Sequence, residues 1–184
     1  EAKIKEIEEK NKKIEAATAI VARSLEEGNT AFNAKDYSLA VTKYEEGVAA
    51  DPDYVGSAPV LLNNKGTALR MRGINTYNAA IKNTDAKARE EGKTSARKDF
   101  ADALEAFHRS YTLLKGAQPG AVPEASLKDQ TARALEGAHA TLKVNAQTEQ
   151  VDGSKMDMAK AMLEAFVATQ PDAAKQAEVK IVLA

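Results

Sequence analysis

The side chains that usually perform catalysis are few and scattered in this sequence. Its 184 residues include two histidines and no cysteine. His108 follows Phe107 and His139 lies among alanines, and neither has a second histidine or a cysteine at metal-ligand spacing. Ser110 lies close to His108 but completes no triad, and no Gly-x-Ser-x-Gly motif occurs. We therefore expect a protein that is not an enzyme, with no catalytic residues, no metal site and no cofactor.

The remaining polar side chains do not form a site for phosphate or nucleic acid. Glycines occur singly, so no phosphate-binding loop is expected. Carboxylates are numerous, but they stand in runs of mixed charge that are typical of solvated helix faces. Acidic residues number 27 and basic residues 26, a balance that argues against a nucleic-acid partner.

The sequence gives no sign of membrane insertion. No stretch approaches the roughly 20 apolar residues of a membrane-spanning helix. The chain begins without Met inside a helical pattern, and it stops within an apolar helix that has just begun. We expect it to be a fragment of a longer protein, in which any signal peptide has been lost. The compartment therefore stays open between the cytoplasm and the periplasm.

Composition and spacing predict that helices position the polar residues. Apolar residues make up 43% of the chain and aromatic residues 5%, and alanine is abundant, a mixture that favours helices in contact through small side chains. Helix starts are indicated by Asp36, Ser57, Asp85, Ser154 and Asp172. With apolar residues recurring three and four positions apart, these signals predict an all-α fold of about six or seven helices. Their approximate ranges are 2–34, 36–50, 57–83, 84–115, 124–150, 154–170 and 172–184.

One short phrase occurs twice, at residues 35–44 and 98–107. Both copies place an aromatic residue, an alanine and a second aromatic residue at the same offsets, namely Tyr37, Ala40 and Tyr44, then Phe100, Ala103 and Phe107. A repeated helical unit predicts an array, because each unit buries its apolar face against a neighbour. Arrays of this kind usually bind other chains.

The first copy lies in a pattern that resembles one unit of the tetratricopeptide repeat (TPR) family, as found in bacterial TPR-containing proteins. Gly28, Tyr37, Ala40, Tyr44, Gly47 and Pro52 stand at the spacings of such a unit, which has roughly 34 residues. The resemblance implies a TPR-like α-solenoid of antiparallel helix hairpins. It divides a single domain, 1–184, into an N-terminal helix extension (1–20), repeat 1 (21–54), an extended repeat 2 (55–115), a divergent repeat 3 (124–171) and a truncated capping helix (172–184).

The later units depart from the pattern of the first. Gly66 and the phrase at 98–107 mark the second, while Gly137, Met156, Ala159, Leu163 and Pro171 give a weaker third. The two copies of the phrase lie farther apart than one repeat, and the excess falls between Arg70 and Lys98. We expect two lengthened helices there, projecting past the array. At Gly28 and Ala40 we expect close approach of two helices, with aromatic rings filling the space beside them.

The resemblance also implies where a partner would bind. In a TPR array the first helix of each unit lines a groove, and the matching positions are Leu25, Asn29, Phe32, Asn33, Asn63, Asn64, Thr67, Arg70 and Met71. Amides can bond to both backbone N–H and C=O, so these positions suit an extended peptide or a helix of a partner protein. The alternative is a face that is solvated, or covered by the long first helix. The expected function is a protein–protein interaction scaffold.

One ligand class of the family fits this sequence poorly. Some members hold the C-terminal carboxylate of chaperones with lysines and asparagines. Asn29 and Asn64 match the two asparagines, but Leu25 stands in place of a lysine, and Thr131 and Leu135 stand where a basic pair is expected. Without its cation a carboxylate loses the strongest contact, so a chaperone tail is disfavoured.

The N-terminal helix carries a second interaction signal. Ile4, Ile7, Asn11 and Ile14 form a heptad seam that continues through Thr18, Val21 and Leu25. A single Asn within such a seam fixes the register of a dimer. This pattern predicts a homodimeric, self-associating structural module as the alternative function. The open alternative is that the seam packs on the chain's own second helix and its tip is solvated. An exposed C-terminal helix, with Val179, Ile181, Val182 and Leu183, offers another surface for a dimer.

Overall fold

The computed structural model describes residues 2–148 and 155–181, and these residues form seven helices and no strand. The helices are α1 (Ala2–Asn33), α2 (Tyr37–Ala50), α3 (Ala58–Ala80), α4 (Ala86–Lys115), α5 (Glu124–Ala146), α6 (Met156–Thr169) and α7 (Ala173–Ile181). The predicted all-α class and the number of helices are confirmed. No helix in the described ranges is both long and apolar enough to span a bilayer.

Aspartates begin three of the helices. Asp36 accepts a hydrogen bond from the Leu39 amide at 3.0 Å, and Asp85 accepts one from the Ala88 amide at 2.7 Å. Asp172 does the same for α7 through the Lys175 amide, at 2.8 Å. Each bond satisfies a backbone donor that has no partner inside the helix, which confirms the predicted starts.

The two predicted serine caps differ from the aspartates. Ser57 occupies the position before α3, but its side chain makes no capping hydrogen bond, and Pro59 supplies the fixed backbone angle of the first turn instead. Ser154 lies outside the described residues, so its predicted capping role stays a prediction; α6 begins at Met156, and Lys155 before it makes no side-chain capping hydrogen bond. The fifth helix ends earlier than expected, at Ala146.

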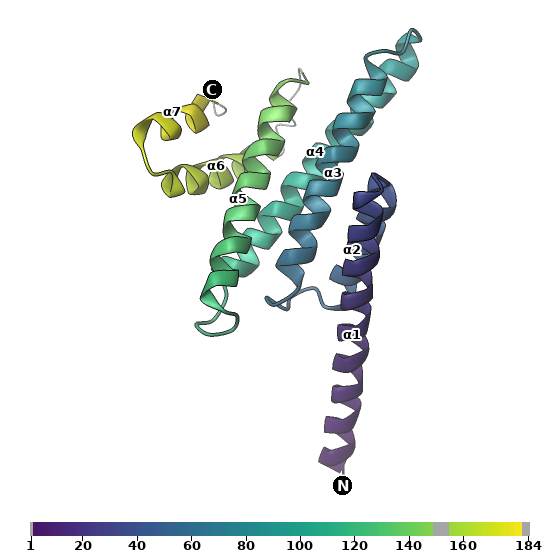
Figure 1. Ribbon diagram of the computed structural model, residues 1–184, viewed down its shortest axis with the longest axis vertical. Coiled ribbons are helices and arrows are strands. Elements are labelled where there is room, and N and C mark those ends of the chain that lie inside the picture. Colours follow the sequence, from purple (N-terminus) through teal and green to yellow (C-terminus); the bar gives the residue numbers. More distant parts are fainter. Residues whose placement is uncertain (1, 149–154, 182–184) are drawn as a thin grey trace.

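Neighbouring helices in the sequence are neighbours in space (Figure 1). Short turns at residues 34–36 and 81–85 make α1 with α2, and α3 with α4, antiparallel hairpins. Helix α3 also contacts α5 directly. As a result α1, α3 and α5, the first helices of the three predicted units, lie next to one another across one face of the molecule (Figure 1).

Small residues allow the two hairpins to close tightly. A Cβ atom added at Gly28 would lie 2.5 Å from the Tyr44 ring, and one at Gly66 would lie 2.8 Å from the Phe107 ring. Real side chains do not approach that closely, so each aromatic ring occupies the space that a glycine leaves open. The expected close contact of helices at these positions is confirmed.

The two alanines of the repeated phrase lie in the same core. Ala40 and Ala103 are both fully buried, with an exposed fraction of 0%. They belong to one cluster that also contains leucines and aromatic rings from α2, α3 and α4, together with Leu135 of α5 and Met162 of α6. One continuous core therefore joins the helices from α1 to α6.

The second hairpin is longer than the first, as predicted. Helices α3 and α4 extend past the body to a turn at residues 81–85, and Figure 1 shows this tip projecting at the upper right. Arg72 and Asp99 bind each other across the hairpin, with N–O distances of 2.9 and 2.6 Å. Asp99 is buried, so this bidentate pair fixes how the two helices lie against each other.

The third pair of helices departs from the expected antiparallel hairpin. In Figure 1, α6 runs across the direction of α5 instead of along it. Helix α6 is short and is held at several points, because Met162 and Leu163 enter the core, Phe166 stacks on His139 at 4.8 Å, and Lys155 binds Glu105 of α4 at 2.9 Å. These contacts to two other helices set the direction of α6.

The two ends of the chain differ in what they expose. The first part of α1 extends away from the other helices, and every residue from 3 through 16 is exposed (Figure 1). At the other end, Val182 and Leu183 lie outside the described residues, as do the side chains of Val179 and Ile181. The predicted C-terminal dimer surface therefore stays a prediction.

Candidate functional site

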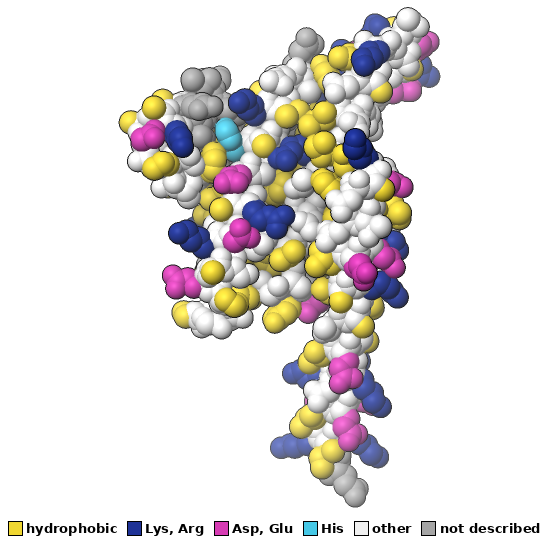
Figure 2. Space-filling view, in the orientation of Figure 1, with side chains coloured by type: hydrophobic (Ala, Val, Ile, Leu, Met, Phe, Trp, Pro, Cys, Tyr) yellow, Lys and Arg dark blue, Asp and Glu magenta, His cyan; other side chains and the backbone are white. Residues whose placement is uncertain are grey.

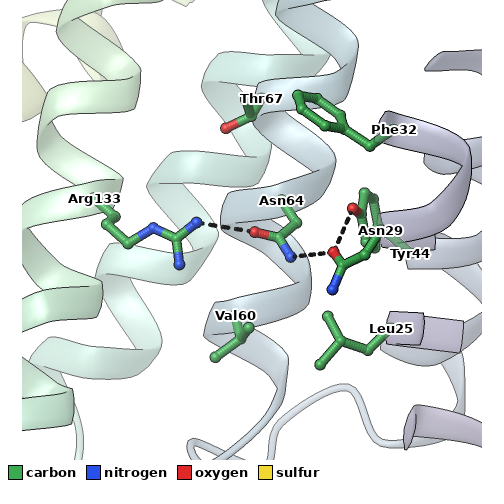
Figure 3. Close-up of a pocket in the computed structure, with 8 residues that line it drawn as sticks. All are labelled: Leu25, Asn29, Phe32, Tyr44, Val60, Asn64, Thr67 and Arg133. Atoms are coloured by element: carbon green, nitrogen blue, oxygen red, sulfur yellow. Dashed lines mark hydrogen bonds between the residues drawn. The ribbon is translucent and has the colours of Figure 1, made fainter. Parts of the chain in front are cut away.

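A hollow of about 390 Å³ lies between α1, α3 and α5 (Figure 3). Its lining consists of apolar, amide, hydroxyl and guanidinium side chains: Leu25, Asn29, Phe32, Tyr44, Val60, Asn64, Thr67 and Arg133. A second hollow of about 320 Å³ adjoins it, lined by Asn63, Thr67, Arg70, Arg133, Glu136, Gly137 and Ala140. Because the two hollows share Thr67 and Arg133, we treat them as one feature, the α1–α3–α5 groove.

The groove contains most of the residues that the sequence pattern assigned to it. Leu25, Asn29 and Phe32 come from consecutive turns of α1, and Asn64 and Thr67 from consecutive turns of α3. Spacing of three and four residues places each set on one face of its helix. Arg70 lies one turn farther along α3, in the second hollow. Asn33 and Met71 line neither hollow.

A chain of hydrogen bonds crosses the groove from α2 to α5. The Tyr44 hydroxyl donates to Asn29 Oδ1 at 2.8 Å, and Asn64 Nδ2 donates to the same oxygen at 3.3 Å. Arg133 Nη2 then donates to Asn64 Oδ1 at 3.1 Å. Figure 3 shows the four side chains in this order. The chain fixes the orientation of both amides, and within the described part of the protein Asn29 Nδ2 stays free to donate to a ligand.

Tyr44 is held in the protonated form that this chain requires. Burial raises the pKa of its hydroxyl above the ordinary value of 10.0, and the charge of Arg133 opposes that shift less strongly. The hydroxyl therefore remains a hydrogen-bond donor through neutral pH.

Two guanidinium groups border the groove. Arg70 is half-buried and donates from Nη1 to the Gly137 carbonyl at 3.2 Å, and burial lowers the pKa of its guanidinium from the ordinary value. Arg133 is exposed on α5. Within the described residues, neither group forms an ion pair with a carboxylate. Both retain donors that suit a carboxylate or a backbone carbonyl.

Asn63, which was predicted to contact a ligand in the groove, instead forms buried hydrogen bonds between α3 and α5. It is almost completely buried, and its Nδ2 donates to the carbonyl oxygen of Gln130 at 3.1 Å and to Gln130 Oε1 at 3.0 Å. These bonds join α3 to α5 beneath the groove. Asn63 therefore fixes α3 against α5 at the inner side of the second hollow, while Asn64, one residue later, lines the first hollow.

Arg133 was not among the predicted groove residues. The TPR resemblance placed the positions of a basic pair at Thr131 and Leu135, on the same helix as Arg133. Leu135 is buried, and the Thr131 hydroxyl donates to the Leu127 carbonyl at 2.7 Å. Arg133 stands between them and reaches Asn64 on α3. In the sequence, Arg133 lies between the small residues Ala132 and Ala134, and this pattern does not show that its side chain extends to α3.

The long first helix does not cover the groove. Its exposed N-terminal part leads away from α3 and α5, while its C-terminal half supplies one wall (Figure 1). In Figure 2, hydrophobic side chains gather between α1 and α5, and charged side chains of both signs lie along α5. An incoming chain would meet apolar surface beside polar groups.

Metal-ligating side chains do not converge in the part of the chain that the structure describes, where no three His, Cys, Asp or Glu residues cluster. Comparison with known proteins found no family model, no curated protein and no solved structure that matches this chain. The TPR resemblance therefore depends on the residues of this sequence alone.

Proposed function

We propose that this chain is a protein–protein interaction scaffold that binds an extended, acidic segment of a partner protein in the α1–α3–α5 groove. The observation that carries the proposal is the position of two guanidinium groups, Arg70 and Arg133, beside the oriented amides of Asn29 and Asn64. Among the described residues neither guanidinium forms an ion pair. The two arginines outnumber the one carboxylate of the lining, Glu136, so a carboxylate of the partner would meet a groove with a net positive charge.

The mixture of side chains favours a peptide over a small anion. Leu25, Phe32 and Val60 offer apolar surface to the side chains of a ligand. Asn29 and Asn64 offer amide groups that match the N–H and C=O groups of an extended backbone. A ligand that uses both kinds of surface carries apolar and polar groups in alternation, as a peptide does.

The array architecture belongs to the same proposal. We take α1 with α2, and α3 with α4, as two units of a short TPR-like solenoid, to which α5 and α6 contribute a divergent third. The recurrence of a glycine against an aromatic ring, Gly28 with Tyr44 and Gly66 with Phe107, supports this assignment. In such an array the first helices form one binding face, as proposed here.

The proposal is tested by selecting peptides from a random display library on the immobilised protein. Selected sequences should be enriched in Asp and Glu beside apolar residues. Arg133→Ala should weaken the best selected peptide about tenfold, the loss typical of one charge-assisted contact. Fluorescence anisotropy with the labelled peptide measures this change, and raising the salt concentration should reduce the difference.

Arg23→Ala is the matched control, because Arg23 is an exposed arginine of α1 that lines neither hollow. Its affinity for the peptide should equal that of the unmodified chain. Selected peptides without acidic residues, or equal binding by the Arg133→Ala protein, would show that the groove does not recognise an acidic segment.

A further inference from the structure

Within the described residues, the apolar side chains in the first part of α1 are not covered by the rest of the chain. Ile4, Ile7 and Ile14 are 61%, 57% and 53% exposed. The surrounding residues are exposed as well, and Figure 2 shows hydrophobic side chains among charges of both signs along this part of the helix. A single helix turned entirely toward water is only marginally stable, so these isoleucines would gain most from a second helix.

We propose that residues 3–18, the N-terminal arm, bind the same arm of a second copy of this chain as a parallel two-stranded coiled coil. The seam consists of Ile4, Asn11 and Thr18 at the a positions of a heptad and Ile7 and Ile14 at the d positions. Beyond it, Val21 and Leu25 pack against the chain's own core. The seam is therefore intermolecular only up to the point where α1 meets α2.

Charge determines the direction of the second helix. The g positions are Lys3 and Lys10, and the e positions are Glu8 and Glu15. In a parallel pair each g residue faces the e residue of the following heptad on the other copy, so every such pair is Lys with Glu. In an antiparallel pair g faces g and e faces e, which brings lysine to lysine and glutamate to glutamate. Only the parallel arrangement satisfies all four charges.

Asn11 determines register and number of strands. In a parallel, in-register pair its amide meets the same amide of the other copy, and the two can hydrogen bond. A shift by one heptad places one Asn11 against Ile4 and the other against Thr18, so the symmetric amide pair is lost and one amide faces an apolar side chain. A single Asn at an a position also favours two strands over the three or four that isoleucines at a and d would otherwise allow.

Association is tested by sedimentation equilibrium of the complete chain. The arm has about two heptads and pairs over roughly 20 Å, so the dimer is weak and the measurement extends to about 1 mM protein. The unmodified chain should dimerise, and Ile7→Asp should weaken association at least about tenfold. Ala16→Asp is the matched control, because position 16 is exposed on the helix face opposite the seam. A monomer at the highest concentration, or a trimer, would overturn the proposal.

Direction is tested with engineered cysteines, since the chain has none of its own. Ile4→Cys should form an intermolecular disulfide under mild oxidation, because the two positions are adjacent in a parallel pair. In an antiparallel pair centred on Asn11 they lie roughly 20 Å apart, far beyond disulfide reach. Ala16→Cys should cross-link slowly in either arrangement. Equal rates for the two variants would overturn the parallel pair.

Charge swaps test the same proposal without removing an apolar side chain. The K3E/K10E chain and the E8K/E15K chain should each remain monomeric, because their flanking charges repel. The chain with all four substitutions should dimerise again, since its g and e charges are merely exchanged. Failure of this fourfold variant to recover association would contradict the assigned pairing.

Discussion

At the residue scale, Tyr44 joins the interior of the first hairpin to the surface of the groove. Its ring fills the space above Gly28, and its hydroxyl holds Asn29 Oδ1 at 2.8 Å. The same side chain therefore keeps α1 close to α2 and orients an amide that we assign to ligand binding. One residue links stability to function here.

The raised pKa of Tyr44 gives a prediction about pH. The folded state favours the protonated hydroxyl, so its stabilising effect is complete below pH 10.0, the ordinary pKa, and disappears as the pH rises through the higher pKa of the folded state. The unmodified protein should lose more unfolding free energy between about pH 8 and about pH 11 than Tyr44→Phe does. Urea denaturation of both proteins measures the difference. Equal losses of unfolding free energy in the two proteins would contradict the prediction.

The sequence predicted the positions of small residues at helix contacts, but it did not predict which polar side chains extend into the groove. Gly28, Gly66 and the alanines of the repeated phrase lie where expected, because a small residue at helix spacing has few uses other than close approach. Asn63 and Asn64 stand side by side in the sequence, yet one is buried against Gln130 and the other faces the groove. Arg133 was missed because a long side chain acts at a distance from its own position in the helix.

At the element scale, the extended α3–α4 hairpin depends on an ion pair inside it. Arg72 and Asp99 bind in bidentate geometry, and the hydrogen bond from Arg72 to Asp99 is the main cause of the raised pKa of the guanidinium. Asp99 has little contact with solvent, since its exposed fraction is 5%. Removing either partner leaves the other charge partly buried and uncompensated.

Asp99→Ala should therefore lower the free energy of unfolding by about 2–3 kcal/mol, somewhat below the cost of breaking a fully buried pair, because Arg72 retains access to water. The double variant Arg72→Met with Asp99→Leu should recover most of the loss. Lys98→Ala is the matched control, since it breaks a neighbouring exposed pair with Asp102 and should cost less than about 0.5 kcal/mol. Equal losses for Asp99→Ala and Lys98→Ala in chemical denaturation would show that the buried pair has no special role.

Helix bounds were predicted better than helix directions. Aspartate caps, a proline and the loop at residues 116–123 are local signals, and they located most starts and ends within a few residues. The direction of α6 depends on contacts with α4 and α5 far away in the sequence, among them Lys155 with Glu105. No local pattern in α6 carries that information, so an antiparallel hairpin was wrongly expected there.

At the scale of the whole molecule, two surfaces lie on different parts of α1. Its C-terminal half forms a wall of the α1–α3–α5 groove, and its N-terminal arm extends away from it (Figure 1). If both proposals hold, the dimer carries two grooves at the same end of its coiled coil. A partner with two acidic segments would then bind more tightly than one segment does, through effective concentration alone.

The central claim is that the α1–α3–α5 groove is the binding surface, and amide chemical-shift mapping tests it most directly. A selected acidic peptide is titrated into the isotopically labelled chain. We predict shifts confined to the groove, at Leu25, Asn29, Phe32, Asn64, Thr67 and Arg133, with the largest change at the Arg133 side chain. Shifts concentrated on the outer face of α4, at residues 86–98, or on α6 and α7, with the groove unchanged, would contradict the account.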